Sequence, residues 1–117
     1  MSVVLLAEFR RPPGGDAALQ TFFDRYESEH LPLIAAVPGL RSMSIHRVVH
    51  RYAGDEDLVL VNEMAFDDRE ALDAAMSSQP MREAGRTLRE IASGLLTLTV
   101  LEPWSAGSSA PTDPEAA

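Results

Sequence analysis

One histidine lies where a helix would carry a core residue. Leu19, Phe22, Phe23, Tyr26 and His30 recur at helical spacings, so a single stripe of a helix presents all five. An imidazole that faces a cavity can take up a proton and return it near neutral pH. We therefore expect His30 to act as a general acid or base. The alternative is a structural histidine at the edge of the core that caps helix carbonyls.

Two neighbours shape this expectation. Tyr26 lies one turn before His30, at a spacing that lets its hydroxyl touch or orient the imidazole. A tyrosine on an apolar stripe is also an ordinary core residue. Pro32 predicts the end of the regular helix, because a proline disfavours helical geometry in the residue before it. This would leave His30 at a helix end that meets both the core and water.

Polar residues also interrupt an apolar run from Leu58 to Phe66. Asn62 and Glu63 lie in the middle of this predicted strand. A carboxylate so close to a core must be paired, hydrogen-bonded or raised in pKa. We expect both residues to be candidates for substrate binding, with a structural ion pair as the alternative for Glu63.

His46 lies in a second predicted strand, from Arg41 to Tyr52. It shares one face of that strand with His50, while Arg47 takes the other face. The two histidines would lie roughly 13 Å apart, too far to hold one metal ion together, and we expect no metal site. His46 is a candidate for binding a substrate oxyanion. The alternative is a charged edge strand that resists aggregation.

The predicted elements that must position these residues follow a recognisable order. Strands are expected at residues 3–9, 41–52, 58–66 and 95–101, and helices at 16–31, from a capping box at 67–70, and at 80–93. With right-handed crossovers this order predicts an α+β, ferredoxin-like βαββαβ fold. Its four-stranded antiparallel sheet would carry the helices on one face.

Composition excludes several classes of function. The chain has 117 residues with 45% hydrophobic content, which fits one domain. Its net charge of −8 disfavours nucleic acid and anionic membranes as partners. It has no cysteine, no apolar run long enough to span a bilayer and no secretory leader, so we expect a cytoplasmic protein. Residues 103–117 are rich in Pro, Ser, Ala and acid and predict a flexible tail.

The first and third strands are apolar on both faces. Val3–Ala7 and Leu58–Val61 lack the alternation that a sheet with one wet face shows. Helices would cover one face, and a second copy of the chain would cover the other through a two-fold interface. We expect a homodimer. The alternative is a monomer whose tail covers the second face.

Two segments resemble a known family. Phe23–Leu33, followed by Val37–Arg41, is similar to the aromatic-x-x-x-His-x-Pro-Leu motif and the Pro-Gly-Leu of the EthD family. That family belongs to the dimeric α/β-barrel superfamily. Met64–Leu72 also resembles its strand-to-helix junction. The similarity spans residues 3–101 and implies an EthD-like dimeric α/β-barrel domain over residues 1–102.

The resemblance also implies a function class. Related barrels include cofactor-free cyclases, isomerases and quinone-forming monooxygenases, and the role of the motif histidine maps onto His30. Tyr26 matches the aromatic position. We expect a small cofactor-independent enzyme that isomerises, cyclises or eliminates on an apolar oxygenated ring, such as a polyketide or lactone. A non-catalytic binding protein for such a metabolite and a cofactor-free oxygenase are the alternatives, since fold does not fix a reaction.

Overall fold

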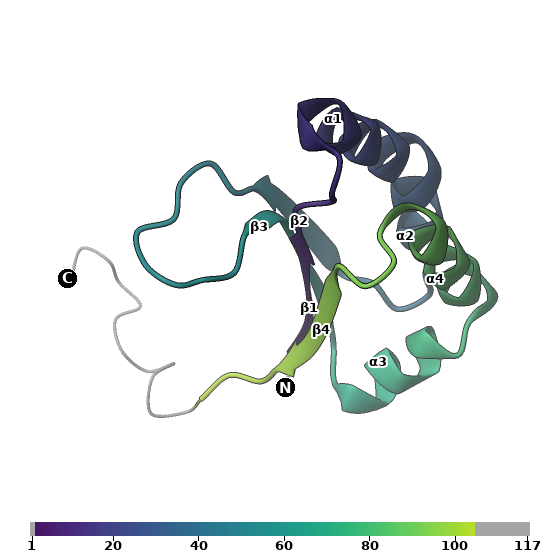
Figure 1. Ribbon diagram of the computed structural model, residues 1–117. Helices are drawn as coiled ribbons and strands as arrows, with labels where there is room; N and C mark the ends of the chain where they lie inside the picture. Colours follow the sequence, from purple (N-terminus) through teal and green to yellow (C-terminus); the bar gives the residue numbers. More distant parts are fainter. Residues whose placement is uncertain (1, 105–117) are drawn as a thin grey trace.

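A single antiparallel sheet with helices on one face forms the molecule. The computed structural model describes residues 2–104. The sheet has the order β2-β3-β1-β4, and its strands are β1 (Val3–Arg10), β2 (Ser42–Arg47), β3 (Leu58–Phe66) and β4 (Leu96–Leu101). The helices are α1 (Gly15–Arg25), the π-helical turn η1 (Tyr26–His30), α2 (Leu31–Ala35), α3 (Arg69–Met76) and α4 (Gln79–Ile91). All lie on the same side of the sheet (Figure 1), and the predicted ferredoxin-like fold is confirmed.

The core lies between the sheet and the helices. Along β1 every second residue is buried, and these residues face the helices. The register pairs Leu5 with Met64 and Ala7 with Asn62, so the same face of β3 also points inward. Within residues 2–104 no helix is long and apolar enough to cross a membrane. Most of the predicted tail lies outside these residues, and Trp104, at its start, is exposed.

The prediction that Pro32 ends the first helix is wrong. The chain stays helical from Gly15 to Ala35, because the π turn η1 joins the end of α1 directly to the start of α2. In this turn the Leu31 N–H bonds to the Tyr26 carbonyl, five residues back. Pro32 then lies in the first turn of α2, where a residue without an N–H is tolerated. His30 is therefore held within a continuous helical segment instead of at its frayed end.

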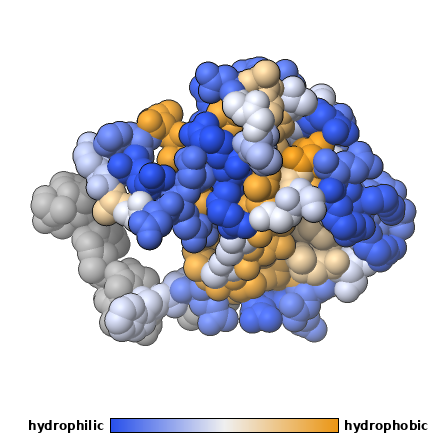
Figure 2. Space-filling model, viewed as in Figure 1, coloured by the Kyte–Doolittle hydropathy of each residue, from blue (hydrophilic) through white to orange (hydrophobic). Residues whose placement is uncertain are grey.

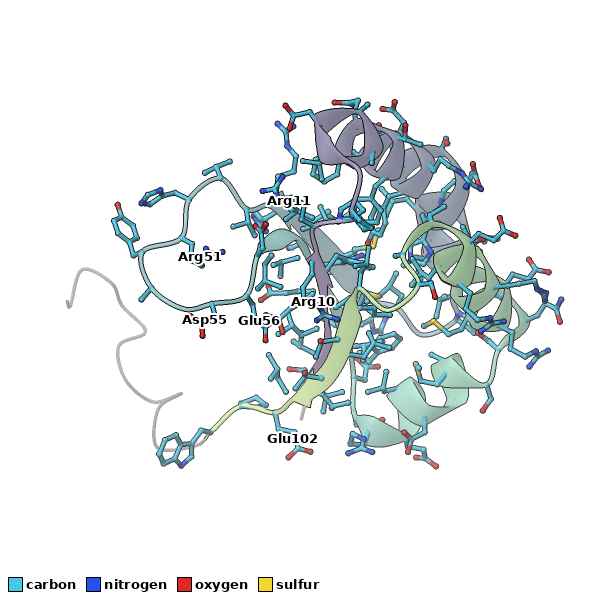
Figure 3. The ribbon with its side chains drawn as sticks, viewed as in Figure 1. Arg10, Arg11, Arg51, Asp55, Glu56 and Glu102 are labelled. Atoms are coloured by element: carbon cyan, nitrogen blue, oxygen red, sulfur yellow. The ribbon has the colours of Figure 1, made fainter. Side chains whose placement is uncertain are left out.

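The second predicted strand is shorter than expected. β2 ends at Arg47, and residues 48–57 form a loop that curves away from the sheet on the side opposite the helices (Figure 1). Ion pairs tether this loop, since Asp57 accepts a 2.7 Å hydrogen bond from Arg11 and lies 3.8 Å from Arg51. Figure 3 shows Arg51 in this loop, on the side opposite the helices, and Arg11 nearer to the sheet and the start of α1. The hairpin pairing of β2 with β3 is as predicted.

The predicted capping box is displaced by one residue. Asp68 caps α3, and its side chain accepts the Ala71 N–H at 2.8 Å. Asp67 instead pairs with Arg41 at 2.8 Å. This ion pair joins the entrance of β2 to the end of β3.

The sheet face away from the helices is apolar only in part. Its half-buried apolar residues lie on the two central strands: Val4, Leu6, Val61 and Ala65. The edge strands add polar residues to this outer face: Ser42, Ser44, His46, Thr97 and Thr99. Glu8 and Glu63 also lie on this face, on the central strands, so the expectation of a second apolar face holds only for a part of the sheet.

Candidate functional site

A cavity of about 300 Å³ lies between the sheet and α4. Its walls are mostly apolar and come from β1, β3, β4 and α4: Leu5, Ala7, Phe9, Met64, Leu88 and Leu96. Apolar residues reach the surface over β4 and the neighbouring helices, on the face shown in Figure 2. Leu98, which also lines the cavity, is 46% exposed. A small apolar ligand would thus reach the cavity along β4.

Three buried polar side chains line this cavity. Tyr26 and His30 come from η1, and Asn62 comes from β3. All three are buried, with exposures of 3%, 3% and 0%. The π turn brings the Tyr26 and His30 rings together with their centroids 4.9 Å apart, and the Asn62 Nδ2 donates a 2.9 Å hydrogen bond to the Tyr26 hydroxyl. The inward orientation predicted for His30 is confirmed.

His30 is held as a neutral imidazole. Burial lowers its pKa to about 4, because the charged form loses its hydration, and a hydrogen bond to the backbone of Ala84 opposes this shift to a smaller extent. Its Nδ1 has no hydrogen-bond partner among the described residues. A neutral imidazole that lines an apolar cavity and keeps one nitrogen unpaired is able to accept a proton.

Tyr26 is held as a neutral phenol. Burial raises the pKa of its hydroxyl to about 12, and the hydrogen bond from Asn62 lowers it by less. The tyrosine ring packs edge-on against Phe9, with centroids 5.3 Å apart. Its oxygen already accepts from Asn62, so its own O–H is left to donate into the cavity. The site thus holds a hydroxyl donor beside a proton acceptor.

The sequence and the fold both match known proteins. The EthD domain model matches residues 16–87. An EthD family protein from Bacillus halodurans shares 34% sequence identity, with 89% of this chain and 100% of that chain covered and a TM-score of 0.78. The chain belongs to the EthD family. The predicted family resemblance is confirmed.

Less similar solved structures share the fold of this chain. A dimeric ferredoxin-like protein of unknown function from Bacteroides fragilis has a TM-score of 0.67 at 13% identity, over 87% of this chain and 96% of that one. SnoaB from Streptomyces nogalater, a cofactor-independent oxygenase, has a TM-score of 0.59 at 18% identity, over 97% of each chain. A comparison with curated proteins gives no match.

Two of the binding residues predicted for this chain lie outside the cavity. Glu63 is opposite Ser44 in the sheet, and His46 is opposite Val61, so both lie on the outer face. Both are exposed. They do not join Tyr26, His30 and Asn62, because neighbouring residues of a strand point to opposite faces. The ion pair considered for Glu63 is not formed with Arg41, which binds Asp67 instead.

Sequence reasoning missed Arg89. It lines the cavity from α4, and the side chain lies close to Gly85, since a Cβ placed there would be 3.9 Å from the Arg89 Nη1. Arg82 and Arg86 lie on the same helix but do not line the cavity. The sequence places all three arginines on one helix and does not indicate which of them lines a cavity. Only the packing of α4 over the sheet makes the distinction.

The burial of His30 predicts a pH-dependent stability. Below its ordinary pKa of 6.5, the unfolded chain binds a proton that the folded chain excludes until about pH 4. The free energy of unfolding should therefore fall as the pH drops through this window, by on the order of 3 kcal/mol from His30 alone. Urea unfolding at pH 7 and pH 4.5 measures the loss. His30→Gln, which cannot titrate, should lose less, and equal losses in both proteins would contradict a buried neutral His30.

Proposed function

We propose that this EthD protein binds a small apolar, oxygenated ring compound and transfers a proton within it through His30. The observation that supports the proposal is the convergence of three buried polar side chains on one apolar cavity. Cavities of this kind bind small molecules by apolar contact and orient them through a few polar groups. Isomerisation, cyclisation and elimination all begin with such a proton transfer.

The proposed step uses two of the three residues. The His30 Nδ1 takes a proton from a carbon next to a carbonyl group, so that the C–H bond breaks and its electrons form an enolate. The Tyr26 O–H donates a hydrogen bond to the enolate oxygen, where the negative charge develops. The imidazolium then returns the proton to a different atom. Positioned acid–base groups contribute about 10²- to 10⁴-fold in rate.

The low pKa of His30 fits this role once a ligand is bound. In the empty cavity an imidazolium is disfavoured, because no described residue supplies a negative charge beside it. An enolate formed next to His30 would supply that charge, and an opposite charge raises the pKa of an imidazole strongly in a dry site. The base would therefore strengthen as the intermediate forms.

A cofactor-free oxygenase is the second candidate. Its support is the structural similarity to SnoaB over 97% of each chain. In this case an anion formed by the same proton transfer would react with O₂ instead of being protonated again. Oxygen consumption with an aromatic hydroxyl compound would separate the two candidates. Binding without any product would instead indicate an accessory protein that sequesters a metabolite.

We also propose that the protein is a homodimer through the outer face of the sheet. The apolar strip of Val4, Leu6, Val61 and Ala65 would be covered by a second copy. The ferredoxin-like protein from Bacteroides fragilis is described as dimeric, which supports a dimer here.

Proton transfer can be tested before the substrate is known. 2-Tetralone, an apolar bicyclic ketone, exchanges acidic carbon-bound protons, and NMR in D₂O follows the uptake of deuterium. The protein should accelerate this exchange above the buffer rate. His30→Gln should reduce the acceleration by at least about 10²-fold, since it removes the base.

His46→Gln is the matched control for this experiment. It changes the same residue type on the outer face, away from the cavity. We expect full acceleration from this variant. Equal acceleration by wild type and His30→Gln would contradict the assignment of His30 as the base.

The dimer is tested by adding a charge to the outer face. Leu6 lies opposite Glu63 in the sheet, so Leu6→Lys places a lysine beside a carboxylate and is tolerated in a single chain. In the proposed interface the lysine would be desolvated, and we expect light scattering after size-exclusion chromatography to show a monomer. Ala17→Lys, an exposed position on α1, should stay dimeric. A dimeric Leu6→Lys would contradict this interface.

A further inference from the structure

Two polar atoms of residues that line the cavity are buried without a partner. These are the His30 Nδ1 and the Asn62 Oδ1. Among the described residues no other buried side-chain nitrogen or oxygen is left unpaired. A buried polar atom without a hydrogen bond is costly, so proteins rarely keep one without a reason. Both atoms belong to residues that line the same cavity.

The orientation of the Asn62 amide makes its free atom an acceptor. Its Nδ2 donates to the Tyr26 hydroxyl at 2.9 Å and lies 3.6 Å from the Met43 Sδ. A sulfur is a weak acceptor and a poor partner for a carbonyl oxygen, so both contacts fit the NH₂ group. The amide is thereby fixed, and the Oδ1 keeps its lone pairs for another donor.

His30 supplies the second unpaired atom, its Nδ1. A neutral imidazole carries one N–H and one lone pair, and the proposed proton transfer requires the lone pair on the Nδ1.

We infer that the ligand of this cavity carries a hydroxyl or N–H donor that pairs with the Asn62 Oδ1. The inference rests on the proposed function only in taking the cavity as a small-molecule site. The ligand class is narrowed from any oxygenated ring to a ring compound that carries a hydroxyl or N–H group, such as a phenol or an enol. A second donor, or the acidic C–H group, meets the His30 Nδ1. An ether or ketone of the same shape leaves the Asn62 acceptor unpaired.

A pair of probes of almost equal shape tests this inference. 1-Naphthol carries the donor, and 1-methoxynaphthalene replaces it with an ether. Isothermal titration calorimetry with the full chain should show 1-naphthol binding about tenfold more tightly, because only the naphthol satisfies the buried acceptor. In Asn62→Leu, which has a side chain of similar size and no acceptor, the ratio should fall below about threefold.

Ile45→Val is the matched control. Ile45 is opposite Asn62 in the sheet and does not line the cavity, so this variant should keep the preference for naphthol. Protection of the backbone amides from hydrogen exchange, compared with wild type, shows whether each variant is folded. If Asn62→Leu does not fold, the two affinities of the wild-type protein decide the inference alone.

The outcomes separate this inference from the proposed function. Equal affinities of wild type for the two probes would overturn the donor requirement while leaving a small-molecule site in place. Saturable binding of neither probe would overturn both. A tenfold preference that persists in Asn62→Leu would show that a group other than Asn62 selects the hydroxyl, which also overturns the inference.

Discussion

The hydrogen bond from Asn62 to Tyr26 is the interaction on which the site depends. It joins β3 to the helical segment in the wall of the cavity, at 2.9 Å and out of contact with water. Because it is dry, breaking it would leave two buried polar groups without partners. The same bond fixes the Asn62 amide, whose oxygen is left as an acceptor. It also uses the Tyr26 oxygen as an acceptor, so the Tyr26 O–H is left as a donor.

The π turn supplies the other half of the arrangement. By adding a residue to the helix, η1 keeps Tyr26 and His30 on the inner side while the chain continues through Pro32. In a regular helix the ring of Pro32 would clash with a carbonyl group of the preceding turn. The distortion therefore serves two purposes: it accommodates the proline, and it brings the tilted rings of Tyr26 and His30 together in the wall of the cavity. This links a local backbone feature to the geometry of the site.

Much of the fold and part of the site could be predicted from the sequence. The apolar run from Leu58 to Phe66 and the helical stripe that carries His30 are local patterns, and both are confirmed. The side of the sheet taken by Asn62 and Glu63 was not predictable, because residues 58–61 before them are all apolar and give no alternation. A shift of one residue exchanges the two faces of a strand. Only the packed helices show that Asn62 faces inward and that Glu63 and His46 do not.

A crystal structure with 1-naphthol bound would test the central claim most directly. We predict that the ring lies between the sheet and α4, with its oxygen within 2.6–3.2 Å of the Asn62 Oδ1 or the His30 Nδ1, as in an ordinary hydrogen bond. A ring bound on the outer face of the sheet would contradict this account. So would a ring in the cavity whose oxygen leaves both of those atoms unpaired.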